Sequence, residues 1–297
     1  MARIAVLGLG AIGGVVAAEL AALGRHEVVV CVREPLQRLS VQRPQGTLDL
    51  PMRALTDPAQ ATPVDWVLLC TKAHQTASVA PWLARLCAAG TRVAVLQNGI
   101  GHAQRVGPFI GDARVVPTIV YYNGERMAPD RMRLRPAGQY EMAVEDSADG
   151  RDFTALLDGS VMRLLQTDDL ATLAWRKLLI NAVANPVTAL TLQRQAVFRR
   201  ADIAALCLDI LEEAASVGRA DGAQLTADEP AAIMRTLLTY PPDAGTSMYF
   251  DRLTGRALEV EALTGAIVAR GQELGVRTPL NGLLQTLLRA VSESAVA

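Results

Sequence analysis

A glycine-rich turn lies directly after the first apolar run of the chain. The run Ile4–Leu7 is followed by Gly8-Leu9-Gly10-Ala11-Ile12-Gly13-Gly14, which opens an alanine-rich helical stretch. In a strand-turn-helix context, G-x-G-x-x-G binds the pyrophosphate of a dinucleotide at the N-terminus of the helix. The first glycine permits the tight turn, the second lets the phosphates approach the backbone, and the third lets helix and strand pack closely. We therefore expect a dinucleotide cofactor to be bound by Gly8, Gly10, Ala11, Ile12 and Gly13.

The first half of the chain alternates short apolar runs with helical patterns, which predicts a parallel sheet with crossover helices. The stretch Arg43–Pro63 is rich in Pro, Gly and Thr and is interpreted as an irregular or hairpin excursion. Met132–Val144 alternates loosely and is expected to add antiparallel edge strands. The expected main strands are Ile4–Leu7, Val28–Val32, Val67–Cys70, Val93–Leu96 and Val115–Val120.

From about Asp168 the apolar residues recur at helical spacing, with stops at Gly222, Pro241 and Gly275. This half is expected to be all helical. The predicted fold class is α/β: an N-terminal Rossmann-type doubly wound parallel sheet followed by a C-terminal all-helical domain. The expected domains are residues 1–167, which would bind the dinucleotide, and residues 168–297, a helical domain for substrate and catalysis.

The composition excludes several classes of function. The formal net charge is −1 with a pI near 6.3, so no general positive field would attract nucleic acid or anionic lipid. Four cysteines without paired spacing are expected to be buried free thiols, and three histidines form no metal-ligand pattern. A bound metal is therefore not expected. No apolar stretch is long enough to span a membrane and no export signal is recognised, so a cytoplasmic protein is expected.

The residue after the second expected strand selects the cofactor. An acidic residue there would accept hydrogen bonds from the ribose hydroxyls of NAD, but the sequence has Val32-Arg33. A guanidinium group suits the additional 2′-phosphate of NADPH. We therefore expect Arg33 to bind NADPH. The alternative is that Arg33 is a solvated arginine at the end of a strand. The acidic neighbour Glu34 argues for that alternative.

A polar stripe marks the second half. Lys177, Asn181 and Asn185 are spaced four residues apart in an otherwise apolar segment, so on a helix they share one face. Burying these groups without partners would be costly. They are expected either to form a buried structural network or to face a ligand.

Several motifs in the same order resemble the ketopantoate reductase (2-dehydropantoate 2-reductase) family over nearly the whole chain. They are the Gly8–Gly14 loop, Arg33, Thr71-Lys72, Leu96-Gln97-Asn98-Gly99, Lys177-x-x-x-Asn181-x-x-x-Asn185-Pro186, and Ser247-Met248 followed by Glu259. The resemblance implies reduction of a small 2-oxo acid, with 2-dehydropantoate giving pantoate as the first expectation. It also implies a general acid at Lys177, its carboxylate partner at Glu259, substrate contacts from Asn98, Asn181, Asn185 and Ser247, and cofactor contacts from Lys72 and Asn98.

Taken without the resemblance, three of these residues have ordinary structural interpretations. Asn98-Gly99 is typical of a turn, Ser247 of a helix cap, and Glu259 of an acid in the first turn of a helix. The sequence also departs from the family pattern, because Gln195-Ala196 stands where the family usually has an Asn-Gly pair. Substrate identity is therefore less strongly predicted than reaction type.

Two rival functions are considered. A β-hydroxyacid dehydrogenase-like enzyme also combines a Rossmann domain with a helical Lys-x-x-x-Asn, but Glu259 and Ser247 argue against it. A non-catalytic NADPH-binding regulator would not need both Lys177 and Glu259. The sequence is compatible with a homodimer and does not determine the oligomeric state.

Overall fold

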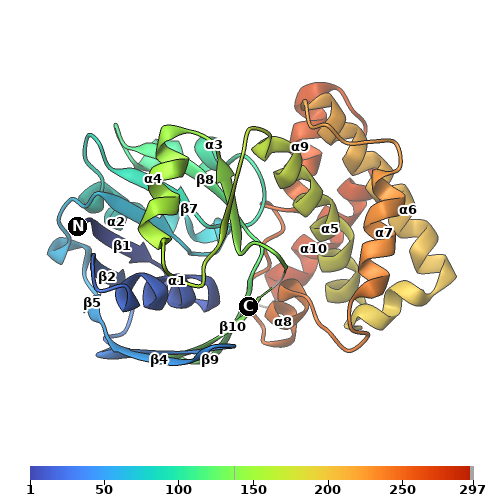
Figure 1. Cartoon of the computed structure of the whole chain (residues 1–297). Helices are drawn as coiled ribbons and strands as arrows, with labels where there is room; N and C mark the ends of the chain where they lie inside the picture. The colour runs from blue at the N-terminus through green and yellow to red at the C-terminus, as the bar shows by residue number, and fades with distance from the viewer. Residues whose placement is uncertain (137, 295–297) are drawn as a thin grey trace. The chain divides into compact units, whose positions relative to one another are not determined.

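The computed structural model describes residues 1–136 and 138–294, and the chain divides into two compact units, Met1–Leu170 and Ala171–Ala297. Unit 1 contains the strands together with helices α1 to α4, and unit 2 is built from helices (Figure 1). No helix in the described ranges combines the length and apolar character needed to cross a membrane.

The larger sheet of unit 1 has eight strands among the described residues, in the order β12-β11-β8-β7-β6-β1-β2-β5. Every neighbouring pair from β8 to β5 is parallel, β11 is antiparallel to β8, and β12 is parallel to β11. The bounds are β1 Arg3–Leu7, β2 Glu27–Cys31, β5 Arg53–Leu55, β6 Trp66–Leu69, β7 Arg92–Val95, β8 Arg114–Val120, β11 Met142–Glu145 and β12 Leu164–Thr167.

Side chains alternate across this sheet, which produces a core on each face. Ile4 and Val6 of β1 pack in the core that includes Val15 of α1 and Phe153 of α4. Ala5 and Leu7 of β1 point to the opposite core, with α2 and α3. Helices on both faces of a largely parallel sheet make this a doubly wound fold, as the sequence predicted. These helices are α1 Ala11–Ala22, α2 Ala80–Leu86, α3 His102–Val106 and α4 Ala148–Leu157.

A second sheet lies against α1 (Figure 1). In the described part of unit 1 it has four strands in the order β4-β3-β10-β9, with β10 parallel to β3. Met132 of β10 packs directly against Gly14, where a Cβ atom would lie 2.6 Å from its Cγ. The strands are β3 Arg38–Arg43, β4 Gly46–Pro51, β9 Asn123–Ala128 and β10 Arg131–Arg135.

The structure refines two of the strand predictions. The excursion at 43–63 contains a hairpin, but its first strand begins at Arg38 and its last strand, β5, joins the main sheet in parallel. The expectation of antiparallel edge strands at 132–144 is wrong, because neither strand lies at an edge. β10 lies between β3 and β9 in the second sheet, and β11, which is antiparallel to β8, lies between β8 and β12. Strand partners depend on long-range packing, which local alternation does not specify.

Unit 2 is formed by helices, as its apolar spacing predicted. Trp175 of α5 is buried and donates a hydrogen bond from Nε1 to Asp221 at 2.9 Å, and Arg270 of α9 binds the same carboxylate at 2.6 Å. These two hydrogen bonds join α5, the segment after α6, and α9. The helices are α5 Leu170–Thr191, α6 Ala201–Ala220, α7 Glu229–Thr239, α8 Ser247–Leu253, α9 Thr264–Leu274 and α10 Pro279–Ser294.

The four cysteines are free thiols. Cys31 and Cys207 are buried as expected, whereas Cys70 and Cys87 are only half-buried. Burial raises the pKa of Cys31 and of Cys207 to about 12, so these two thiols stay protonated at neutral pH. They are packing residues of the core.

Candidate active site

The glycine loop joins β1 to α1 and supports two of the three roles predicted for its glycines. Gly8 has a φ of +101°, and a Cβ on it would lie 2.8 Å from the backbone nitrogen of Thr71. A Cβ on Gly13 would lie 2.0 Å from the carbonyl oxygen of Gly8. Gly8 is therefore required by the turn, and Gly13 by the close approach of helix and strand.

Gly10 differs from both of its neighbours in the motif. It is the N-cap of α1, its φ of −83° is open to any residue, and a Cβ there would meet nothing within 4 Å. The fold itself therefore does not require glycine at this position. The first turn of α1 contains no acidic residue and has no side-chain cap, so its N-terminus is suited to an external anion such as a pyrophosphate.

Two residues that the sequence analysis missed hold the start of α1. The hydroxyl of Tyr122 donates to the carbonyl oxygen of Ile12 at 2.8 Å, and burial raises the pKa of this phenol well above its usual value. At Gly124 a Cβ would lie 2.4 Å from the carbonyl oxygen of Ala11, so β9 needs a glycine to pass over the helix. The signal in the sequence is the aromatic pair and Asn-Gly at 121–124, which resembles an ordinary hairpin turn.

Arg33 is exposed two residues beyond the end of β2, which is the neighbour of β1. Its guanidinium makes no hydrogen bond or ion pair with any described residue. No interaction within the described fold therefore requires the charge of Arg33, and its guanidinium is available to a ligand near the glycine loop.

Lys72 and Asn98 follow the next two strands of the sheet, β6 and β7, so the structure brings them to the same carboxyl edge as the glycine loop. Both side chains are half-buried. The two loops are joined by Gln97, whose amide nitrogen donates to Thr71 Oγ1 at 3.2 Å. This link was not predicted, because no local pattern distinguishes a bridging glutamine from a surface one.

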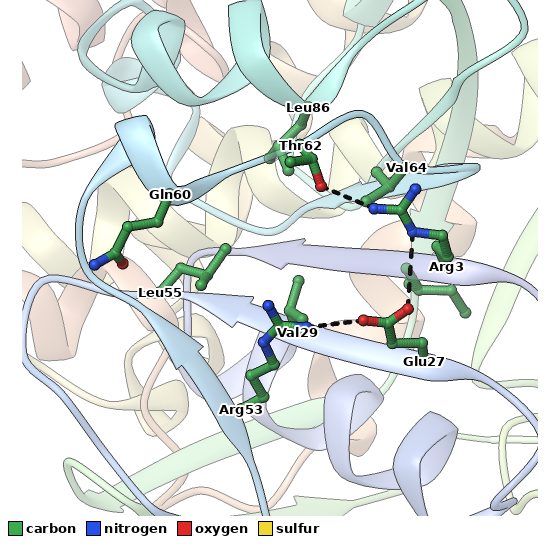
Figure 2. A pocket seen from close by; sticks show the side chains of 10 residues that line it. Arg3, Glu27, Val29, Arg53, Leu55, Gln60, Thr62, Val64 and Leu86 are labelled. Atoms are coloured by element: carbon green, nitrogen blue, oxygen red, sulfur yellow. Dashed lines mark hydrogen bonds and ion pairs between the residues drawn. The ribbon is translucent and has the colours of Figure 1, made fainter.

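A small hollow occurs at the opposite edge of this sheet, beside the first residues of β1, β2 and β5 (Figure 2). Glu27 lies between two cations there, 2.9 Å from Arg53 and 3.7 Å from Arg3. Arg3 also donates to Thr62 at 2.8 Å. Glu27 already pairs with both arginines of this hollow, Arg3 and Arg53, so the candidate site is placed at the carboxyl edge instead.

In unit 2 the predicted polar stripe lies on α5, as its spacing required. Lys177 and Asn181 are half-buried, and Asn185 is only 3% exposed. Burial lowers the pKa of Lys177 to about 8, and the negative charge of Glu259 opposes that shift. The two residues that the resemblance pairs as acid and carboxylate are thus electrostatic partners in the fold.

The position of Glu259 corrects one expectation. It does not begin a helix: it lies in the segment between α8 and α9, and α9 begins at Thr264. Its side chain is only 4% exposed. A first-turn acid on a solvated helix would not need burial, so the helix-dipole interpretation of Glu259 is wrong.

Ser247 is likewise not a helix cap. The N-cap of α8 is Thr246, whose hydroxyl accepts a hydrogen bond from the backbone of Tyr249 at 3.1 Å. The same hydroxyl lies 2.7 Å from that of Thr188 on α5. Ser247 is the exposed first residue of α8, positioned by this link between α8 and α5.

Gln195 stands where the sequence departs from the family pattern. It is 7% exposed in a short 3-10 helix, Gln195–Arg199, and its backbone nitrogen donates to Ala244 at 3.0 Å. Its side-chain oxygen Oε1 has no hydrogen-bond partner among the described residues. A buried carbonyl group without a donor is unfavourable and is suited to accept one from a ligand.

The carboxyl edge of unit 1 therefore gathers the glycine loop, Lys72 and Asn98, and unit 2 pairs Lys177 with Glu259. Within the described ranges, no group of three or more His, Cys, Asp or Glu side chains could hold a metal ion. In unit 1 the N-terminus of α1 is suited to an anion, and in unit 2 an ammonium of lowered pKa is suited to proton transfer.

Comparison with known proteins decides the family. The sequence model described as ketopantoate reductase PanE/ApbA matches residues 4–147, and its C-terminal companion matches residues 169–292. A 2-dehydropantoate 2-reductase of Caulobacter vibrioides is 38% identical over 295 residues, covering 98% of this chain and 100% of that protein. The chain belongs to the ketopantoate reductase family.

Solved structures of ketopantoate reductases share the complete fold. One from Ralstonia eutropha superposes with a TM-score of 0.89 at 28% identity and covers 99% of this chain and 100% of its own. One from Staphylococcus aureus, described as dimeric, has a TM-score of 0.87 at 27% identity and covers 99% of both chains. The resemblance seen in the motifs, and the predicted fold class, are thereby confirmed.

Proposed function

We propose that this protein is an NADPH-dependent 2-dehydropantoate 2-reductase, which reduces the keto group of a small 2-oxo acid to a hydroxyl. The observation that carries the proposal is the pairing of Lys177 with Glu259 in a chain 38% identical to a 2-dehydropantoate 2-reductase. A regulator that only bound the dinucleotide would not need an ammonium paired with a buried carboxylate.

The residues of unit 1 fit NADPH. Gly10 leaves open space at the N-terminus of α1 for the pyrophosphate, and Arg33 offers its guanidinium to the 2′-phosphate. Ala11 and Ile12 offer the first backbone N–H groups of the helix, and Lys72 and Asn98 line the adjacent edge. When bound, the dinucleotide would supply the hydride for the keto carbon.

Lys177 would perform the proton transfer. As hydride reaches the keto carbon, negative charge develops on the carbonyl oxygen, and an ammonium in hydrogen-bond reach stabilises this charge and donates the proton. A pKa of about 8 keeps most of the lysine protonated at neutral pH while making it a stronger acid than a solvated lysine. Glu259 keeps the ammonium charged and orients it.

The remaining polar residues would position the substrate. Asn181 and Asn185 extend from Lys177 along one face of α5, and Ser247 begins α8 with its hydroxyl unused by the cap. Amide and hydroxyl groups bind a small hydroxylated acid through directed hydrogen bonds. We assign these three residues and Asn98 to substrate binding.

Gln195 bears on which 2-oxo acid is preferred. Its unpartnered Oε1 could accept a hydrogen bond from a substrate hydroxyl, such as that of 2-dehydropantoate. A site built to bond a hydroxyl discriminates strongly against analogues that lack one. Gln195→Leu should therefore reduce the preference for 2-dehydropantoate over a 2-oxo acid of similar size without a hydroxyl.

The deciding experiment is the loss of NADPH absorbance with a panel of 2-oxo and 3-oxo acids. We expect the highest kcat/KM with 2-dehydropantoate. Preference for a 3-oxo acid would indicate the β-hydroxyacid dehydrogenase-like alternative, and NADPH binding without turnover of any acid would indicate a regulator.

A homodimer is part of the same proposal. Its support is the Staphylococcus aureus relative, which is described as dimeric. Sedimentation equilibrium of the purified protein should give twice the mass of the 31.7 kDa chain, and a mass equal to one chain would contradict it.

A further inference from the structure

A buried glutamine links two loops at the carboxyl edge of unit 1. Gln97 is 5% exposed and directly precedes Asn98. Its side chain contacts Thr71 and Thr76, which lie in the segment after β6, and Arg105 of α3. Gln97 therefore joins the loop that carries Lys72 to the loop that carries Asn98.

The contacts determine the orientation of the Gln97 amide. Arg105 can only donate, so the atom 3.2 Å from its Nε must be the acceptor Oε1. Thr76 uses its one hydroxyl proton in a 2.9 Å bond to the carbonyl oxygen of Ala73, so it accepts from Gln97 Nε2 at 3.1 Å. The second proton of Nε2 is directed to Thr71 Oγ1 at 3.2 Å. Both protons and the oxygen of this amide are thus used.

Arg105 extends the network into the backbone of the Asn98 loop. Its guanidinium donates to the carbonyl oxygen of Ile100 at 3.1 Å and to that of Asn98 at 3.5 Å. The loop needs such support because Gly99 and Gly101 have φ of +89° and +68°, and glycine backbones are the most easily deformed.

On the other side, the network reaches the cofactor turn. Thr71, which accepts from Gln97, is also the residue whose backbone nitrogen lies where a Cβ on Gly8 would clash, at 2.8 Å. The glycine turn, the Lys72 segment and the Asn98 loop are thus connected through one buried amide. A shift of that amide would move groups that are proposed to bind both reactants.

We infer that Gln97 is a positioning residue for the reductase reaction: its amide, held by Arg105, sets the place of Asn98 relative to Thr71 and Lys72. The inference rests on the proposed function for the identity of the reactants. Gln97 itself need not touch substrate or cofactor, because its donors and acceptor are already used within the fold.

The test is a double-mutant cycle between Gln97→Met and Asn98→Ala. Methionine keeps the volume of the side chain and removes every hydrogen bond. Because small misplacements of catalytic groups are costly, we expect Gln97→Met alone to lower kcat/KM for the 2-oxo acid by about 10- to 100-fold. In the Asn98→Ala background the same change should have less than about a 2-fold effect on kcat/KM for the acid, because the Asn98 amide that Gln97 positions is already absent.

Two further variants identify which contacts matter. Gln97→Glu keeps an acceptor for Arg105 but loses the N–H donors to the threonines, so its kcat/KM should be intermediate. Gln104→Met removes an exposed amide on the same helix as Arg105 and should leave kcat/KM unchanged. The same cycle measured on the Kd for NADPH gives a readout that does not depend on the acid used.

The outcomes separate the inference from the proposed function. Equal effects of Gln97→Met in both backgrounds, or full activity of Gln97→Met, would overturn the positioning role. A wild-type protein that binds NADPH but reduces no 2-oxo acid would contradict the proposed function, and the cycle on NADPH affinity would still support or overturn the role of Gln97.

Discussion

The carboxylate of Glu259, in the segment before α9, raises the pKa of the Lys177 ammonium on α5, while burial lowers that pKa to about 8. The two effects oppose each other, and burial is the larger. Half-buried Lys177 therefore loses its proton at a lower pH than a solvated lysine, and only with Glu259 ionised does it keep that proton up to about pH 8.

The pH dependence of the reaction should show this pair. Because the acid form of Lys177 is required, kcat/KM should be flat near neutral pH and fall about tenfold per pH unit above about pH 8. Glu259→Gln removes the charge that raises the pKa, so the fall should begin at lower pH. Glu261→Gln is the matched control, since Glu261 binds Arg289, and its profile should coincide with wild type. An unchanged profile in Glu259→Gln would exclude the pairing from catalysis.

Replacing Lys177 should separate catalysis from structure. Lys177→Met should lower kcat by about 10²–10⁴, the usual contribution of a general acid, with little change in NADPH affinity. Residual activity near the wild-type value, in a folded protein that binds NADPH, would rule out Lys177 as the acid.

Removing both charges of this pair should not destabilise the fold. Folding lowers the pKa of Lys177 from 10.5 to about 8, so at neutral pH the protonated lysine opposes folding by roughly 3 kcal/mol. This penalty is fully present below pH 8 and disappears as the pH rises toward 10.5, where the unfolded lysine also loses its proton. At pH 7 the Tm of Lys177→Met/Glu259→Gln should therefore equal or exceed that of wild type. A strong decrease would show instead that the pair is a structural network.

Arg33 should determine the choice of dinucleotide. Arg33→Ala should reduce the ratio of kcat/KM for NADPH to that for NADH by about 10- to 100-fold, as expected for hydrogen bonds to a charged phosphate. Arg38→Ala is a suitable control, because Arg38 is an exposed neighbour that pairs with Asp49 at 3.1 Å. Wild-type preference for NADH, or an unchanged ratio in Arg33→Ala, would contradict the assignment.

The glycines of the loop should separate binding from folding. Gly10→Ala places a methyl group in open space, so the Tm should change little while NADPH affinity falls at least about tenfold, because the pyrophosphate would meet the methyl group. Gly13→Ala places it 2.0 Å from a carbonyl oxygen and should lower the Tm by several degrees. If the two substitutions had equal effects on NADPH affinity and on Tm, Gly10 would have the same structural role as Gly13 and no separate role in binding the pyrophosphate.

Much of the fold was readable from local patterns. Each expected main strand forms, and its observed bounds lie within one residue of the expected ones. These strands were readable because a buried parallel strand is a short run of β-branched and aliphatic residues. The polar stripe of α5 follows from helical spacing alone. The partners of the later strands were not readable, because β10 and β11 join different sheets and strand pairing depends on residues far away in the chain.

By itself, the sequence determined the fold class, the family, the glycine turn, and the face of α5 that carries Lys177, because each depends on the order and spacing of nearby residues. Only the tertiary structure decided that Glu259 is buried outside a helix, that Thr246 rather than Ser247 caps α8, and that Gln97 joins two loops. These three facts depend on groups that are distant in the chain or on where a helix begins. The burial and the hydrogen-bond partners of a residue are set when the chain packs. The same residue at the same position in the sequence could be buried or exposed and could have different partners.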